Sequence, residues 1–158
     1  MPNDGLTFKE RILAKAVEIQ MGQPMEAPVI APVDKPLDQS KVALVTTAGI
    51  HLKKQKPFIP EDGDHTFRLI PRETPPADLT VTHGHYDETD VRKDINCLLP
   101  MERLEELVEE GFIQASASTH ISFMGYIPNV APLIKESAPE AARILKAENV
   151  DIAVLTPG

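Results

Sequence analysis

The chain has 158 residues, of which 42% are hydrophobic and 25% are charged, and its formal net charge is −8. This composition indicates one globular domain with a core of its own, and the negative charge argues against nucleic acid or an anionic membrane as main partner. The sequence contains no apolar run near the roughly 20 residues of a membrane span and no signal peptide, and its single cysteine fits a reducing cytoplasm.

The first 40 residues are predicted to form a helix and a connector. Thr7 and Glu10 have the spacing of a capping box, and apolar residues then recur at helical spacing, which predicts a helix within residues 1–21. Residues 22–40 carry four prolines at four-residue intervals and are predicted to be an extended connector. The remaining residues, 41–158, are predicted to form the main domain.

Within residues 41–158, predicted strands alternate with predicted helices. The strands are expected at 41–50, at 78–82, within 112–124 and at 150–155, the helices at 100–110 and 137–148, and a long loop at 51–76. The last strand, in Asp151–Gly158, is an apolar run typical of a strand buried on both faces. Such runs, separated by helices, predict an α/β fold with a doubly wound, mostly parallel sheet of the Rossmann-like type.

Histidines fall at three of the predicted junctions between a strand and a loop. Because the carboxyl ends of parallel strands share one edge, these side chains could converge on a substrate. The alternative for any single histidine is that it only caps backbone groups. The candidate substrate-binding residues are Thr46, Thr47, His51, His83, His85, Tyr86, Asp87, His120 and Ser122.

A metal site is a second interpretation of the same residues. His83, His85 and Asp87 alternate, so an extended backbone would point all three in one direction, as zinc or iron would require. Together with His120 they would form the metal site of a metal-dependent enzyme. Without a metal, the same side chains could bind the carboxylate or amine of a small substrate. Cys97 lies in an apolar segment and is predicted to be a buried structural thiol.

Several ordered segments resemble the selenoprotein B family of the glycine, sarcosine, betaine and D-proline reductases. The resemblance runs from about residue 41 to the end, and the overall size is similar to the small proline-reductase-type subunit. The segments that carry it are Thr46–Lys53, Thr82–Asp87, Asp94–Asn96, Leu99–Leu104, Glu110–Gly111 and His120–Ile127.

The resemblance implies a redox residue outside these 158 positions. In the proline-reductase type, the strand that matches Asp151–Gly158 is followed directly by selenocysteine, with a cysteine a few residues on. We therefore expect a reading frame truncated at that codon, no catalytic residue in this chain and no activity of the chain by itself. We also expect a sheet that is incomplete at its C-terminus, with an exposed edge and an apolar face that favour a homo-oligomer.

The resemblance also implies a function. The complete protein would be a subunit of a selenocysteine-dependent reductase that cleaves a C–N bond of an amino acid or related amine. A pyruvoyl group on a partner subunit activates the amine in some members, and a thioredoxin-like reductant resets the selenium. The candidate residues would position and protonate the substrate. The alternatives are a non-catalytic binding or assembly module of the same fold and the metal-dependent enzyme.

Overall fold

The computed structural model describes residues 31–84 and 87–157, and the larger of its two compact units spans Val33–Gly158. The main sheet of this unit is built around β1 (Lys41–Thr46). Strand β7 (Ile152–Thr156) runs parallel to β1 along one edge. The other edge of β1 is shared by two shorter parallel strands, β5 (Ala115–Ser116) and β6 (Thr119–Ser122).

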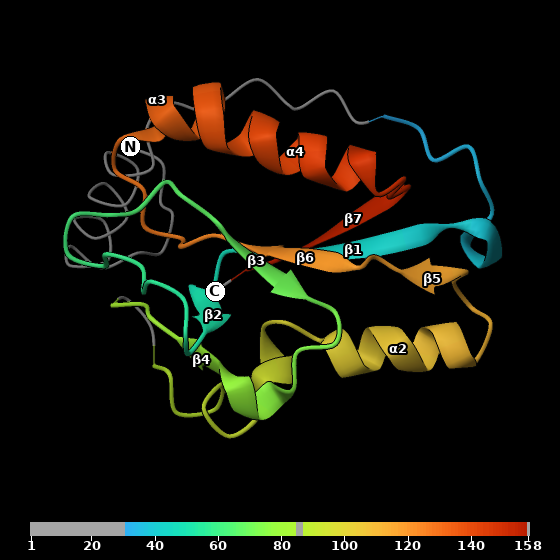
Figure 1. Ribbon diagram of the computed structural model, residues 1–158, viewed down its shortest axis with the longest axis horizontal. Coiled ribbons are helices and arrows are strands. Elements are labelled where there is room, and N and C mark those ends of the chain that lie inside the picture. Colours follow the sequence, from blue (N-terminus) through green and yellow to red (C-terminus); the bar gives the residue numbers. More distant parts are fainter. Residues whose placement is uncertain (1–30, 85–86, 158) are drawn as a thin grey trace, which may run out of the picture. The chain divides into compact units, whose positions relative to one another are not determined.

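The described sheet is mixed, because β3 (Arg68–Pro71) pairs antiparallel with β6. Helices α2 (Met101–Glu109) and α4 (Ala138–Ala147) lie on opposite sides of it (Figure 1). The mixed α/β class is thus confirmed, whereas the doubly wound, Rossmann-like order remains a prediction.

Successive side chains of β1 point into two separate hydrophobic cores. Val42 and Leu44 pack on the α2 side with Leu104, and Ala43 packs on the α4 side with Leu145. Neighbouring side chains of a strand point to opposite faces, so a strand covered on both faces has to be apolar throughout. This explains why the apolar run of β1 was recognisable as a central strand.

Helix α2 confirms the prediction for residues 100–110, and Gly111 has the positive φ of 71° expected of a residue that ends a helix. The start of the helix predicted at 137–148 is wrong, and the Ser137 side chain makes no cap hydrogen bond. The helical stretch begins earlier, with α3 (Val130–Pro132) and a π-helical turn, η4 (Leu133–Ser137), that continues into α4. The N-cap is Asn129, whose side chain accepts a hydrogen bond from the Ala131 N–H.

The strand predicted at 78–82 exists as β4 (Leu79–Val81), but it lies outside the main sheet. It pairs antiparallel with β2 (Ile50–Leu52) in a separate two-stranded sheet. The strand predicted over 41–50 is therefore divided, and Gly49, with φ of 69°, lies at the break. A Cβ at Gly49 would lie 2.3 Å from the Thr82 carbonyl oxygen, so this close approach of two chain segments requires glycine.

The loop predicted at 51–76 is also wrong, because it contains the end of β2 and all of β3. Short 3₁₀ turns complete the fold: η1 (Leu37–Gln39), η2 (Pro76–Asp78) and η3 (Ile95–Cys97). Turn η1 lies in the described part of the predicted connector, whereas the predicted N-terminal helix lies outside the described residues. No helix in the described part of the chain is long and apolar enough to cross a membrane.

Two burial predictions are corrected. Strand β7 is confirmed, but Val154 is 41% exposed and Leu155 is 75% exposed, because β7 is an edge strand among the described residues. The expected truncation of the sheet remains a prediction. Cys97 is exposed rather than buried, because the 3₁₀ turn packs its neighbours Ile95 and Leu98 against the core.

Candidate functional site

The carboxyl ends of β1, β6 and β7 meet at one edge of the main sheet. The Thr47 N–H donates to the Thr156 carbonyl oxygen at 3.1 Å, and the Phe123 N–H donates to the Thr46 carbonyl oxygen at 2.8 Å. An isolated antiparallel bridge joins Ala48 to Met124. Parallel strands therefore place three chain segments side by side here, as expected from the sequence.

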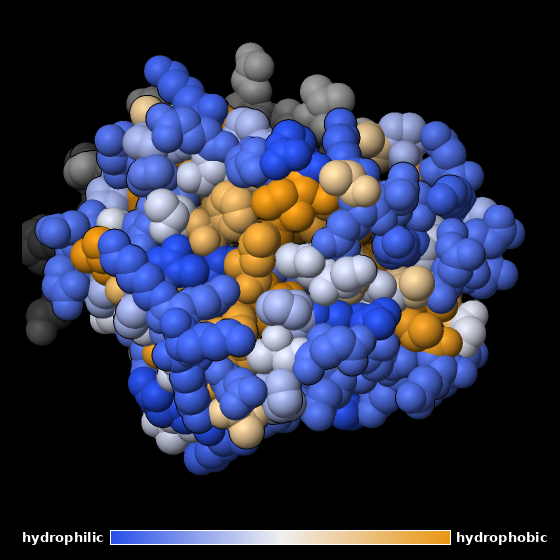
Figure 2. Space-filling view, in the orientation of Figure 1, coloured by the Kyte–Doolittle hydropathy of each residue, from blue (hydrophilic) through white to orange (hydrophobic). Residues whose placement is uncertain are grey.

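A largely apolar groove of about 470 Å³ opens between this edge and α4. Figure 2 shows apolar side chains gathered on the face where α4 lies over the strands. Residues from β1, β6, α4 and β7 contribute to the lining, among them Thr47, Met124, Gly125, Ala142, Leu145 and Leu155. Concave, mainly apolar sites with a few polar groups are typical of small-molecule binding.

His83 reaches this edge from the second sheet. The Thr82 N–H donates to the Gly49 carbonyl oxygen at 2.9 Å, which brings the end of β4 to the turn after β1. A Cβ added to Gly125 would lie 3.3 Å from both His83 Nε2 and the Thr47 carbonyl oxygen. Thr47, His83 and Gly125 thus converge from three segments, and we take them as the candidate site.

His51 lies behind the candidate site rather than in it. It is a residue of β2 and only 2% exposed, and its ring nitrogens contact the Leu52 carbonyl oxygen and Thr82 Oγ1, both at 2.9 Å. The bond to Thr82 connects β2 to the residue that precedes His83. His51 therefore helps to position His83. It has the structural role named as the alternative in the sequence analysis, because its ring contacts a backbone carbonyl group.

His120 is also separate from the candidate site. It is fully buried within β6, and its Nδ1 accepts the Leu44 N–H at 3.1 Å, which makes the ring a substitute for a backbone carbonyl between β1 and β6. Burial lowers the pKa of His120 to about 4, and the nearby charge of Glu148 offsets this only in part. The neutral ring therefore carries its proton on Nε2, which lies 3.5 Å from Ser116 Oγ.

The remaining predicted residues fall into three groups. Thr46 and Ser122 are fully buried at the strand ends, where Thr46 Oγ1 accepts the Ala48 N–H at 3.2 Å. Asp87 is exposed and accepts hydrogen bonds from Thr89, which lower the pKa of its carboxyl group. His85 and Tyr86 lie outside the described residues.

The metal interpretation needs His85 and therefore remains a prediction. Within residues 31–84 and 87–157, no three His, Cys, Asp or Glu side chains are grouped so that they could hold a metal ion.

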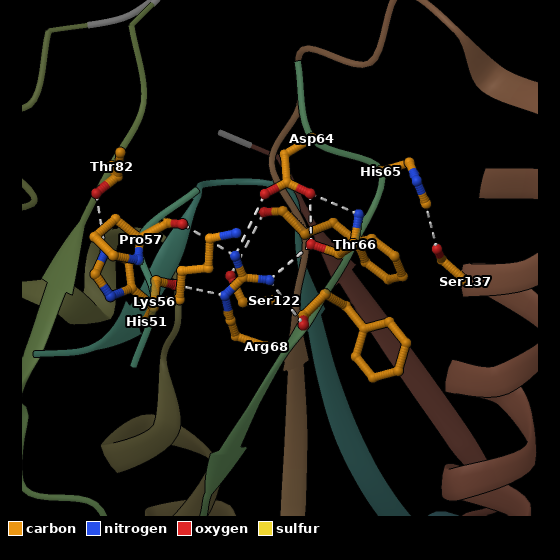
Figure 3. A network of polar contacts seen from close by, with 12 residues as sticks. His51, Lys56, Pro57, Asp64, His65, Thr66, Arg68, Thr82, Ser122 and Ser137 are labelled. Carbon is orange, nitrogen blue, oxygen red and sulfur yellow. Dashed lines mark hydrogen bonds and ion pairs between the residues drawn. The ribbon is translucent and has the colours of Figure 1, made fainter. Parts of the chain in front are cut away.

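A buried ionic network next to the end of β6 was missed in the sequence (Figure 3). Arg68, which is paired with Ser122 across the sheet, donates to the carbonyl oxygens of Lys56 and Pro57 and contacts Asp64 at 3.3 Å. Its guanidinium group also lies 4.2 Å from the centre of the Phe58 ring. Arg68 thus ties the loop before β3 to the sheet. The only sequence signal was the alternation of Asp64, Thr66 and Arg68 ahead of a short apolar run.

Comparison with known proteins agrees with the resemblance. The profile of the family "Glycine/sarcosine/betaine reductase selenoprotein B" matches residues 14–158. The D-proline reductase subunit gamma of Acetoanaerobium sticklandii is 47% identical over 131 residues, which make up 83% of this chain and 54% of the relative. The chain thus spans about half the length of that relative, and no solved structure matches it significantly. The chain belongs to the glycine/sarcosine/betaine reductase selenoprotein B family.

Proposed function

We propose that this chain is part of a subunit of a cytoplasmic, multi-subunit reductase that cleaves a C–N bond of an amino acid or related amine. The observation that carries the proposal is the 47% identity to a D-proline reductase subunit. The convergence of Thr47, His83 and Gly125 beside an apolar groove supports it, because a small ring or methylated amine needs apolar contact around one polar end. D-proline is accordingly the first substrate to test, followed by glycine, sarcosine and betaine.

The proposed roles follow from the positions of the groups. His83 would hold the amine end and deliver a proton to the leaving nitrogen, and Thr47 would orient the substrate. The apolar lining from α4 and β6 would exclude water. A pyruvoyl-containing partner subunit, a thioredoxin-like reductant and a doubly wound continuation of the sheet belong to the same proposal.

Selenocysteine, which the family name implies, supplies a nucleophile with a pKa below that of a thiol. In this proposal such a group would follow β7. There the Thr156 carbonyl oxygen is bonded to the Thr47 N–H, and Thr156 Oγ1 donates to the Leu98 carbonyl oxygen at 2.6 Å. These two bonds fix the end of β7 beside the groove. We therefore propose that the residues described here bind and position the substrate.

Isothermal titration calorimetry with the four amines tests this function. For Gly125→Ala we expect affinity for the bound amine to fall by at least about tenfold, because the new methyl group occupies the space between His83 and Thr47. Ala147→Ser is the control, since it also adds one heavy atom, but at an exposed residue at the end of α4 that does not line the groove. Equal affinity of both variants, or binding of none of the amines, would favour the non-catalytic assembly module instead.

A further inference from the structure

Thr82 is the residue through which the end of β4 is held before the chain reaches His83. The residues of β4 that pair with β2 end at Val81. Beyond this point the Thr82 N–H donates to the Gly49 carbonyl oxygen, and Thr82 Oγ1 lies 2.9 Å from His51 Nε2 (Figure 3). The end of a short strand frays easily, so these two bonds are what keep Thr82 in place.

The direction of the hydrogen bond between Thr82 and His51 follows from the other ring nitrogen. His51 Nδ1 lies 2.9 Å from the Leu52 carbonyl oxygen. A carbonyl oxygen can only accept, so Nδ1 carries a proton, and in the neutral ring Nε2 is then an acceptor. The Thr82 hydroxyl group therefore donates to Nε2. The ring is buried and meets the Phe58 ring edge-on at a centroid distance of 6.1 Å, which limits its freedom to turn away.

Gly49 connects Thr82 to the end of β6 by two backbone bonds. Its carbonyl oxygen accepts the Thr82 N–H, and its N–H donates to the Phe123 carbonyl oxygen, both at 2.9 Å. His83 follows Thr82, and Gly125 lies two residues after Phe123. A Cβ added to Gly125 would lie 3.3 Å from His83 Nε2, so a displacement of Thr82 directly changes the separation of His83 and Gly125.

The face on which Thr82 is anchored also matters. His51 is paired with Thr80 across the second sheet, and Thr82 is two residues farther along, so all three side chains belong to one face. In extended backbone the next side chain points to the opposite face. Anchoring Thr82 on His51 therefore directs the His83 ring away from His51 and toward the candidate site.

We propose that Thr82 is a positioning residue of the candidate site, and that His51, as the Nδ1–H tautomer, fixes its hydroxyl group so that the His83 ring stays beside Gly125. The consequence for substrate binding rests on the proposed function, in which His83 holds the amine. The placement of the His83 ring relative to Gly125 does not depend on any substrate and is tested separately.

A long-range ¹H–¹⁵N correlation spectrum of the histidine rings, recorded in mildly alkaline solution, tests the direction of the bond. The signals of His51 are assigned by their absence in His51→Phe. We expect a protonated Nδ1 and an unprotonated Nε2 for this ring. A ring with its single proton on Nε2, or with protons on both nitrogens, would overturn the assigned direction.

The amide signal of Gly125 reports the position of the His83 ring without substrate. Thr82→Val keeps the size of the side chain but removes the hydroxyl group, so the ring should move and the Gly125 signal should shift. Thr82→Ser keeps the hydroxyl group and should leave the signal near its wild-type position. Thr80→Val is the matched control, because it makes the same change two residues earlier on β4. An unmoved Gly125 signal in natively folded Thr82→Val, or an equal shift in Thr80→Val, would contradict the proposal.

Isothermal titration calorimetry tests the effect on binding. Affinity for the amine that the wild-type chain binds should fall at least about fivefold in Thr82→Val and stay within about twofold in Thr82→Ser and Thr80→Val. The double variant His51→Phe/Thr82→Val should bind no more weakly than His51→Phe, because both changes break one hydrogen bond. Unchanged affinity in Thr82→Val, or additive losses in the double variant, would overturn the role of Thr82. If no amine binds to the wild-type chain but the Gly125 signal responds as expected, the proposed function fails and the positioning role holds.

Discussion

Arg68→Ala is expected to lower the free energy of unfolding by about 1.5 to 3 kcal/mol, because it removes an ion pair and several hydrogen bonds made by a partly buried charged group. The Arg68 and Asp64 side chains are only 11% and 8% exposed, and the guanidinium group also satisfies the carbonyl oxygens of Lys56 and Pro57. Without it, Asp64 Oδ2 loses its ion-pair partner while Oδ1 keeps its hydrogen bonds from Thr66, and two carbonyl oxygens lose a donor. Urea denaturation, monitored by circular dichroism, measures this loss of stability.

The control for this prediction is Arg143→Ala. Arg143 pairs with Glu140 at 2.6 Å, but both side chains are well exposed, so the loss should be below about 1 kcal/mol. Burial alone would raise the pKa of Asp64, but hydrogen bonds from Thr66 and the charge of Arg68 outweigh it and lower the pKa below its usual value. The network thus contributes stability at neutral pH that is lost in acid. An equal effect of the two arginine variants would contradict the role of Arg68.

The second large effect is a loss of stability in mild acid that originates at His120. The pKa of His120 is about 4 in the folded chain and about 6.5 in an unfolded chain. Between these values the unfolded state binds more protons, so the free energy of unfolding falls as the pH is lowered, by roughly 3 kcal/mol in total for this group. Denaturation curves measured from pH 7 to pH 4 report the slope.

His120→Asn separates this titration from the structural role of the ring. The asparagine amide oxygen can still accept the Leu44 N–H but does not titrate, so we expect the variant to lose this part of the pH dependence. His120→Leu leaves the buried Leu44 N–H without an acceptor and should cost about 1 to 3 kcal/mol at pH 7. An unchanged pH slope in His120→Asn would show that the acid sensitivity arises elsewhere.

The sequence predicted best those elements whose local pattern and tertiary environment agree. β1 is apolar throughout because both faces are covered, and α2 has an apolar stripe, a proline before it and a glycine after it. β3 was not predicted because its apolar residues are only two, and they are flanked by Arg68 and Pro71. The helix before Ser137 was missed because Pro128 and Pro132 are read as loop residues, although Pro132 lies in the first turn, where proline is tolerated.

The candidate site was predicted only in part, because a single parallel sheet was assumed. Thr47 lies at the expected edge, but β4 belongs to a different sheet, and His83 reaches the site only through the close contact of Gly49 with Thr82. No local pattern in the sequence encodes that contact. For the same reason, the structural role of His120 could not be predicted. Its hydrogen bond with the Leu44 N–H depends on a gap in the pairing of β1 between β5 and β6.

The most direct test of the proposed substrate edge is a titration of the ¹⁵N-labelled chain with D-proline, followed by heteronuclear NMR. We predict that the largest shift changes occur at Thr47, His83 and Gly125. Little change is expected at the separate polar pocket of about 500 Å³ that is lined by Lys53, Asp94 and Asn96. Shifts concentrated in that polar pocket, with Thr47 and Gly125 unmoved at saturation, would contradict the assignment of the site.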